Sequence, residues 1–165
     1  MLEKQVKVAY LGIGSNLGNR YHNIIKAKSN LCTKNIKILK TSNYYESYSW
    51  PDPTKPKFLN IVVKIVTNNS VKNLLRICKD VEALLGRKKT FKNAPRTCDI
   101  DILDYNNEVS SKGVNLPHPR IHKRNFVLIP LFEINKHWKH PIFKKDIKSM
   151  IYSLSKKEIT SIKLI

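Results

Sequence analysis

Two aspartates separated by one residue, Asp99 and Asp101, are the side chains whose type and spacing best suit chemistry. They alternate with apolar residues in the segment 97–103, which reads as a strand. Because strand side chains alternate between faces, both carboxylates lie on one face, with Cα atoms about 6.6 Å apart. Such a pair repels unless a cation lies between its members, and Mg²⁺ favours one or two carboxylates together with water and substrate phosphates. A solvated aspartate pair is the alternative, because this short motif is weak by itself.

Cationic side chains flank the aspartate pair on both sides in the sequence. They are Arg87, Lys88, Lys89, Lys92 and Arg96 before it, and His118, Arg120, His122, Lys123 and Arg124 after it. Arginine and lysine beside metal-binding carboxylates suit phosphoryl-type transfer, because they neutralise charge on the transferred and leaving groups. We assign functional roles to Arg87, Arg96 and Arg124, and interpret Lys88 and Lys92 as solvated loop residues.

Two other groups of residues could mark a ligand site. Gly12, Gly14 and Gly18 form G-x-G-x-x-x-G, which is one residue longer than the dinucleotide fingerprint. We therefore interpret these glycines as turn residues that permit close backbone packing. Phe58, Asn60 and Phe126 would suit a flat heterocycle, stacked between rings and bonded at its edge, although aromatic residues in strands usually belong to the core.

The elements that must position these residues follow from the hydrophobic pattern. Strands are expected over 6–13, 36–48, 58–66 and 97–103, and helices over 21–32, 71–85, 126–134 and 146–154. Ser70 is the expected N-cap of the second helix and Gly86 its stop. Asp104 lies past its predicted strand and is expected to matter little.

This order predicts an α+β fold in which a ferredoxin-like βαββαβ core forms one domain over residues 1–165. Helices cover one face of an antiparallel sheet, extra helices follow at the C-terminal end, and the second sheet face is free for a site. A proline-rich loop, 50–56, and the basic loop, 87–96, interrupt the regular elements.

Composition limits the class of protein. With 165 residues and 41% hydrophobic content the chain can bury a core, and no apolar run reaches the roughly 18–20 residues of a membrane span. The opening residues do not show a signal-peptide pattern, so we expect a cytoplasmic protein. Cys32, Cys78 and Cys98 are expected to be reduced, buried thiols. A formal net charge of +19 indicates anionic partners, although many lysines are explained equally well by biased composition.

Several segments together resemble the 6-hydroxymethyl-7,8-dihydropterin pyrophosphokinase family of folate biosynthesis. The most specific are Pro95-Arg96-Thr97-Cys98-Asp99-Ile100-Asp101-Ile102-Leu103 and Leu116-Pro117-His118-Pro119-Arg120, supported by 11–19, 58–60, 82–87 and 124–131. The resemblance extends from Tyr10 to about Ile134. It implies transfer of the β,γ-diphosphate of ATP to the hydroxymethyl group of the pterin, with release of AMP.

The resemblance also implies roles for matching positions. Asp99 and Asp101 would hold two Mg²⁺ ions, and Arg87 and Arg96 would be catalytic. ATP, as co-substrate, would contact Glu82, Lys89, Arg96, Ile102, His118 and Arg124. The pterin would contact Ser47, Tyr48, Phe58, Asn60 and Phe126. Two departures lie in the basic loop, where Lys89 replaces an arginine of some members and no tryptophan stands near Asn93.

The expected partners are these two small-molecule substrates, with no nucleic acid, no membrane and no second copy of the chain, so we expect a monomer. The main alternative from another class is an RNA-binding ferredoxin-like module, which the fold and charge would suit but whose aromatic signature is missing. A related aldolase or a bifunctional folate enzyme is a third interpretation, and we expect no second folate domain in 165 residues.

Overall fold

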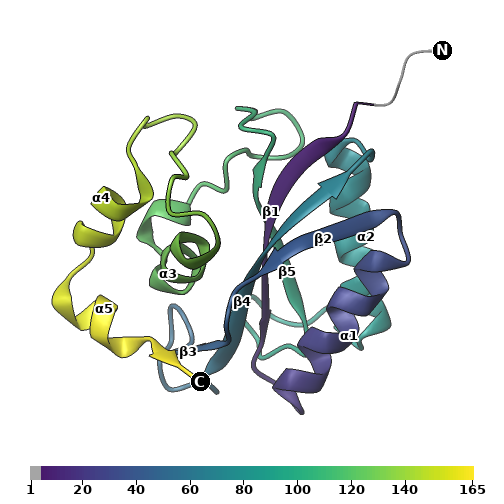
Figure 1. The fold of residues 1–165 in the computed structure, drawn as a ribbon. Coiled ribbons are helices and arrows are strands. Elements are labelled where there is room, and N and C mark those ends of the chain that lie inside the picture. Colours follow the sequence, from purple (N-terminus) through teal and green to yellow (C-terminus); the bar gives the residue numbers. More distant parts are fainter. Residues whose placement is uncertain (1–4) are drawn as a thin grey trace.

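The computed structural model describes residues 5–165 as an antiparallel sheet with helices on both faces (Figure 1). The strands are β1 (Lys7–Ser15), β2 (Ile36–Thr41), β3 (Tyr45–Ser47), β4 (Phe58–Thr67), β5 (Asp99–Tyr105) and β6 (Lys163–Leu164). The helices are α1 (Arg20–Cys32), α2 (Val71–Leu84), α3 (Asn125–Ile134), α4 (Ile147–Tyr152) and α5 (Lys156–Ser161), with the short 3-10 helix η1 (Ile121–Lys123) before α3.

The strands follow the spatial order β5–β1–β4, and the far side of β4 pairs with both β2 and β3. Together with α1 and α2 this is the predicted βαββαβ arrangement. Helix α2 begins after Ser70, whose hydroxyl accepts a hydrogen bond from the Asn73 amide at 3.3 Å. It stops at Gly86, which has a φ of +85°, so both predicted helix ends are confirmed.

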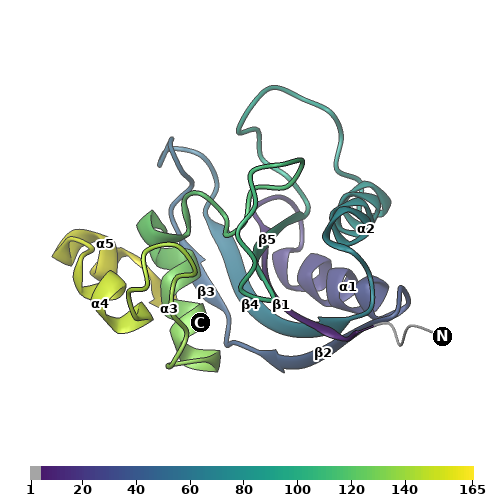
Figure 2. The ribbon, with the colours of Figure 1, turned by 90° about the horizontal axis from the view of Figure 1, so that it is seen from above.

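One face of the sheet packs against α1 and α2 (Figure 2). Leu11 of β1 and Ile100 of β5 meet Leu31 of α1 and Val81 of α2 in this core. All four side chains are almost completely buried. Burial of apolar side chains at this interface is the main force holding these two helices to the sheet.

The second face is only partly free, which corrects the expectation of an open surface. Tyr10, Val62 and Leu103 form an apolar area that α3 covers with Leu128 and Leu131. Figures 1 and 2 show α3, α4 and α5 together on this side, opposite α1 and α2. The remaining part of this face, toward the end of the sheet where β1 stops and β4 begins, carries the polar residues described below.

The strand predicted over 36–48 is interrupted between β2 and β3. Ser42 causes the break by bonding twice to one residue of β4: its backbone amide donates to the Val62 carbonyl at 2.9 Å, and its hydroxyl accepts from the Val62 amide at 3.0 Å. The prediction of one continuous strand was therefore wrong at residues 42–44, where side-chain bonding replaces regular pairing.

A bulge in β5 changes the face on which Asp104 lies. Tyr10 pairs with Asp104 and Leu11 with Ile102, so Leu103 is an extra residue and the alternation of side chains reverses beyond it. Asp104 is 1% exposed, and its carboxylate accepts from Trp138 Nε1 at 2.7 Å and from the Asn107 amide at 3.0 Å. Burial raises the pKa of this carboxyl. The expectation that Asp104 lies past its strand was wrong, because β5 extends to Tyr105; its small effect on activity stays a prediction.

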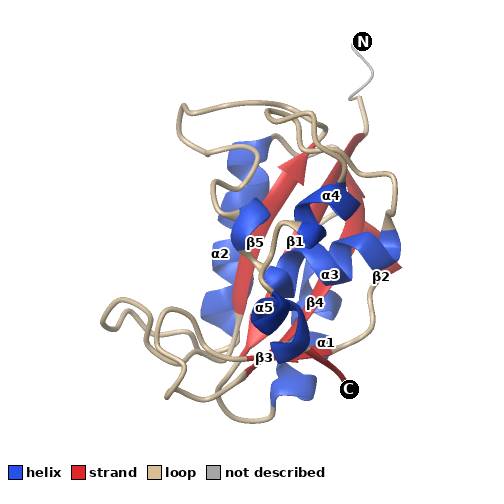
Figure 3. Cartoon of the chain, turned by 90° about the vertical axis from the view of Figure 1, so that its left-hand side faces the viewer, coloured by secondary structure: helices blue, strands red, loops and turns tan. Residues whose placement is uncertain are grey.

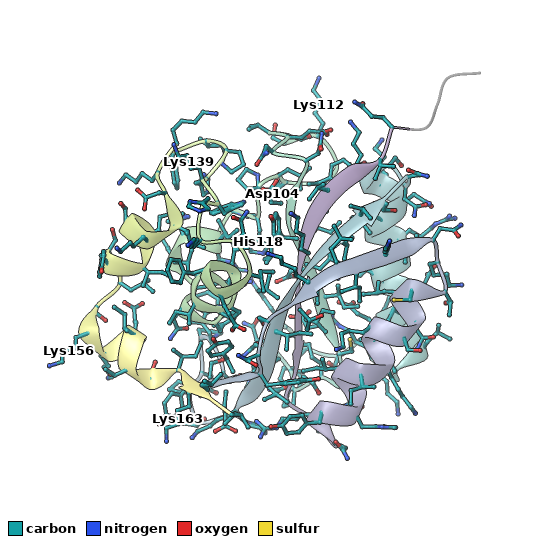
Figure 4. The ribbon with its side chains drawn as sticks, in the orientation of Figure 1. Asp104, Lys112, His118, Lys139, Lys156 and Lys163 are labelled. Carbon is teal, nitrogen blue, oxygen red and sulfur yellow. The ribbon has the colours of Figure 1, made fainter. Side chains whose placement is uncertain are left out.

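The surface of the described chain agrees with other parts of the sequence analysis. The labelled lysines of Figure 4, such as Lys139 and Lys156, extend outward at the periphery, as solvated residues do.

Cys78 and Cys98 are buried free thiols, and burial raises the pKa of each to about 12. Cys32 is also free but exposed, so its predicted burial was wrong. Within residues 5–165, no helix has the length and apolar character needed to cross a membrane.

Candidate active site

The candidate site begins as a row of residues across three neighbouring strands. Asp99 of β5 pairs with Gly14 of β1, which in turn pairs with Asn60 of β4. Two residues further along β5, Asp101 pairs with Gly12. These residues line a pocket of about 220 Å³. Because the two glycines carry no side chain, they form a low floor between the carboxylates on β5 and the amide on β4.

Each aspartate of the pair faces arginine. Asp99 Oδ1 lies 2.8 Å from Arg87 Nη1 and 3.3 Å from Arg96 Nη1, and Asp101 Oδ2 lies 2.9 Å from Arg124 Nη1. The side chains of this cluster are between 14% and 31% exposed. Such partly buried ion pairs hold the carboxylates in place and place cations where an anionic ligand would enter.

Glu82 connects helix α2 to the strand that carries the aspartates. Its Oε1 accepts from the Ile100 amide at 2.7 Å and pairs with Arg87 Nη1 at 2.6 Å, while Lys79 Nζ lies 3.2 Å from Oε2. Burial raises the pKa of this carboxyl. Glu82 thus fixes both the backbone beside Asp99 and the arginine that faces it.

His118 lies beside Asp101 in the connection from β5 to α3. Its backbone amide donates to the Leu103 carbonyl at 2.8 Å, and its Nδ1 accepts from the Arg120 amide at 3.1 Å. Burial lowers the pKa of the imidazole. Nε2 is 3.7 Å from Asp101 Oδ2 and 3.5 Å from Arg124 Nη1, so this nitrogen faces the carboxylate side of the pocket.

The other half of the pocket is aromatic and amide in character. Asn60 is buried, and its Nδ2 donates to Ser47 Oγ at 2.9 Å, which orients the amide. Phe58 and Phe126, from β4 and α3, line the pocket together with Tyr48. A planar ligand could contact these rings while the Asn60 and Ser47 side chains bind its edge.

Most residues singled out in the sequence meet in this pocket. Ser47, Tyr48, Phe58, Asn60, Arg87, Arg96, Asp99, Asp101, His118, Arg124 and Phe126 all line it. Glu82 and Lys89 instead line an adjoining hollow of about 920 Å³ beneath the basic loop. Ile102 is buried in the helix-side core and lines neither hollow of the described chain.

Other residues at the site were not foreseen. Asn16 is buried, and its side chain accepts from the Arg96 amide at 2.8 Å and donates to the Pro56 carbonyl at 3.0 Å. Contacts spanning 40 and 80 residues leave no local signal in a sequence. Trp50 also lines the pocket, as does Arg120, which the sequence analysis named only as a flanking cation; Arg120 Cζ lies 5.0 Å from the indole ring centroid. Gly12 and Gly14, interpreted as turn residues, lie within β1.

A ferredoxin-like α+β fold with an arginine-framed carboxylate pair and an aromatic-amide pocket defines a class of phosphate-transferring enzymes. Within it, the chain belongs to the 7,8-dihydro-6-hydroxymethylpterin-pyrophosphokinase (HPPK) family, whose model matches residues 10–136. A 2-amino-4-hydroxy-6-hydroxymethyldihydropteridine pyrophosphokinase of Aquifex aeolicus is 44% identical over 140 residues, or 84% of this chain and 87% of the relative. One of Bacillus subtilis is 36% identical over 129 residues, or 77% of each chain.

Solved structures support the fold. The wild-type HPPK-DHPS of Plasmodium falciparum superimposes with a TM-score of 0.75 at 16% identity, covering 98% of this chain and 44% of that chain. This chain therefore spans less than half the length of that neighbour. It likewise covers 20% of the folic acid synthesis protein fol1 of Pneumocystis carinii, to which it is 38% identical over 87% of its own length.

Proposed function

We propose that this chain transfers the β,γ-diphosphate of ATP to 6-hydroxymethyl-7,8-dihydropterin in a step of folate biosynthesis. The observation that carries the proposal is the single pocket in which Asp99 and Asp101 lie across a glycine floor from Asn60. Its two halves suit the two substrates, because one suits a metal-bound polyphosphate and the other a flat heterocycle.

On the pterin side, Phe58 and Phe126 would enclose the two faces of the ring system. Asn60, fixed by its bond to Ser47, would present its carbonyl oxygen to the donors at the edge of the pterin. Ser47 and Tyr48 would complete this contact along the end of β3. Burial of Asn60 makes the readout selective, because a ligand lacking the matching donors would leave a buried polar group unpaired.

The carboxylate side fits magnesium by its donor set. Asp99 Oδ2 and Asp101 Oδ1 have no protein partner in the described chain, while their other oxygens pair with arginine. No group of three or more His, Cys, Asp or Glu side chains suited to a metal occurs within residues 5–165. A pair of carboxylates without further protein ligands suits ions that keep water and phosphate ligands. Two Mg²⁺ ions held there would neutralise phosphate charge and polarise the transferred group.

The basic residues would orient ATP around this pair. Arg87 and Arg96, which already face Asp99, would neutralise the transferred and leaving groups. His118 and Arg124, which both lie beside Asp101, would contact the ATP phosphates. Glu82, Lys89 and the Ile102 backbone would contact the nucleotide at or beside the adjoining hollow.

In the proposed reaction the pterin hydroxymethyl oxygen forms a bond to the β-phosphorus of ATP. The bond between that phosphorus and the α,β-bridging oxygen breaks, AMP leaves with the oxygen, and the hydroxyl proton passes to water. No covalent intermediate with the protein is required. Positioning and charge stabilisation would therefore supply the catalysis.

The RNA-binding alternative receives no support from the sheet. Four-stranded RNA-binding modules of this type use the exposed sheet face for base stacking. Here α3 covers Val62 and Leu103 on that face. The remaining open part carries Asp99 and Asp101, which would repel a nucleic-acid backbone.

The proposal is tested by AMP release from ATP and hydroxymethyl-dihydropterin in the presence of Mg²⁺. Asp99→Ala and Asp101→Ala should each lower kcat by about 10²-fold or more, because the metal that holds the phosphates loses a ligand. Lys139→Ala, which removes a peripheral charge (Figure 4), is the matched control. Near-wild-type rates in either aspartate variant would refute the assigned metal site.

A further inference from the structure

Two loops border the candidate site at the same end of the sheet (Figures 2 and 3). The proline-rich loop lies in the connection from β3 to β4, residues 48–57, and the basic loop lies in the connection from α2 to β5. Trp50 lines the pocket from the first loop, while Asn93 and Arg96 line it from the second. Each loop therefore supplies part of one wall.

The side chain of Lys55 bridges the two loops directly. Its Nζ donates to the Asn93 carbonyl at 3.0 Å and lies 5.2 Å from the centroid of the Phe91 ring. The first contact is a charge-assisted hydrogen bond and the second a cation–π contact. Lys55 itself lines neither hollow of the described chain, so these contacts account for its position better than a contact with a ligand does.

The proline-rich loop holds Lys55 firmly. Asp52 Oδ1 accepts from the backbone amide and the hydroxyl of Thr54, at 3.0 and 2.6 Å. The Lys55 amide donates to the Asp52 carbonyl at 3.3 Å, which closes the turn. Pro53 lies within this turn and Pro56 follows it, and both restrict the backbone further. The Lys55 ammonium group therefore extends from a turn whose backbone is restricted.

The conformation of the basic loop places the partners of Lys55 within its reach. Asn93 adopts a φ of +61°, a conformation that asparagine tolerates better than most residues, and the Ala94 amide donates to the Phe91 carbonyl at 3.2 Å. Phe91 is 70% exposed, so burial in a core does not explain its orientation. The Lys55 ammonium group over the face of the Phe91 ring explains that orientation.

Asn16 joins the same loops at a deeper level, through the Pro56 carbonyl and the Arg96 amide. The loops are thus connected twice: by a buried amide on the floor side and by Lys55 at the rim. Asn16 fixes the base of each loop. Lys55 holds the basic loop at Asn93, which lies three residues before Arg96.

We infer that Lys55 is a positioning residue that couples the proline-rich loop to the basic loop, so that both walls of the site move as one unit. The inference rests on the proposed function for its effect on turnover, because Arg96 would act on ATP and the proline-rich loop borders the pterin side. The coupling itself is a property of the protein without substrates.

The first test measures backbone ¹⁵N order parameters in the substrate-free protein. In Lys55→Ala, order parameters over residues 90–93 should fall below about 0.6, the value of flexible backbone. Lys55→Arg, which keeps a cation and a donor, should preserve most of the wild-type order, and Lys139→Ala should leave it unchanged. Unchanged order parameters in Lys55→Ala would overturn the inference.

The second test is steady-state kinetics on the same variants. Lys55→Ala should lower kcat/KM by about three- to tenfold, less than the full loss of one charge-assisted bond and one cation–π contact, because Lys55 acts on the reaction only through the basic loop. Lys55→Arg should recover most of the loss. Phe91→Ala should have a smaller effect in the wild type and almost none in Lys55→Ala, because the two side chains act through one contact.

The order parameters and the kinetics together distinguish failure of the proposed function from failure of the coupling. If the wild type releases no AMP, the proposed function fails, and the order parameters still decide the coupling. If Lys55→Ala weakens binding of an ATP analogue without loosening residues 90–93, Lys55 is a phosphate-binding cation and the coupling is refuted. If neither order parameters nor kcat/KM change, Lys55 has no positioning role.

Discussion

At the scale of single residues, the floor of the pocket depends on the two glycines of β1. A Cβ added at Gly14 would lie 3.1 Å from Asn60 Oδ1 and 3.3 Å from Phe58 Cδ1, whereas one at Gly12 would meet Leu103 at an ordinary 3.5 Å. The first contact is tight and involves the two residues proposed to bind the pterin. The missing side chain at position 14 is therefore part of the proposed binding surface.

We predict that Gly14→Ala weakens pterin binding about tenfold, or about 1.4 kcal/mol. The added methyl group pushes Asn60 and Phe58 from their positions, and Gly12→Ala should have a smaller effect. Calorimetric titration with the pterin in the presence of an ATP analogue measures both. Equal affinities in the wild type and Gly14→Ala would show that Asn60 and Phe58 do not read the pterin.

Asp104 shows where reasoning from the sequence reached its limit at this scale. Alternation along β5 correctly placed Asp99 and Asp101 on one face, because both precede the bulge at Leu103. The bulge then moved Asp104 inward, and nothing in the local sequence signalled it. Asn16 was missed for a similar reason, since its partners are distant in the chain.

Replacing Asp104 with alanine should lower the free energy of unfolding by about 1–3 kcal/mol. The Trp138 indole and the Asn107 amide would each lose their acceptor inside the protein. Urea denaturation followed by the fluorescence of the buried Trp138 provides the measurement. A midpoint equal to that of the wild type would contradict the structural role assigned to this carboxylate.

At the scale of elements, helix α3 stabilises the break that Ser42 makes between β2 and β3. Glu133 accepts from the Asn43 amide at 2.9 Å and from the Tyr45 hydroxyl at 2.6 Å. The propensities of β-branched and aromatic residues favoured one strand over 36–48, but they could not reveal these bonds from a helix about 90 residues away. The strand over 58–66 and helix 126–134 were predicted well because their apolar patterns are strong.

Glu133→Ala should reduce stability by about 1 kcal/mol, because two hydrogen bonds to an exposed carboxylate are lost. Glu133→Gln, which keeps one acceptor oxygen, should recover part of that loss. Thermal unfolding of the three proteins at one concentration gives the comparison. If the alanine and glutamine variants are both as stable as the wild type, α3 does not hold the break.

At the scale of the whole molecule, two histidines link stability to pH. His140 is 2% exposed, its Nδ1 accepts from the Ile142 and Phe143 amides at 3.2 Å, and its ring lies 6.2 Å from that of His122. Burial, and then the neighbouring charge, lowers the pKa of both rings below 6.5. The unfolded chain therefore binds protons at a higher pH than the folded chain does.

The histidine contribution to stability should be complete above about pH 6.5 and be lost as the pH falls through the folded pKa values, with a slope of at most about 1.4 kcal/mol per pH unit for each proton. The raised pKa values of Glu82 and Asp104 act in the opposite direction. Comparison with His140→Asn isolates the effect, because that variant should show a shallower fall in unfolding free energy between pH 7 and 5. Identical slopes would contradict the assignment.

The fold and most pocket residues could be predicted because strand alternation, helix caps and the matching segments act locally. The covering of the second sheet face could not, because α3 carries apolar residues on several sides and its partner surface is defined by Tyr10, Val62 and Leu103 together. The total charge of +19 indicated anionic partners but did not identify which cations would contact them. The cations proposed to act on ATP are those held within reach of Asp99 and Asp101.

The most direct measurement follows the phosphorus-containing products of one reaction by ³¹P NMR, with ATP, hydroxymethyl-dihydropterin and Mg²⁺. We expect equal amounts of AMP and pterin diphosphate, formed only when both substrates are present. ADP with a pterin monophosphate would instead show transfer of a single phosphoryl group. Either that product pair or the absence of any pterin-dependent AMP would contradict the proposed diphosphate transfer.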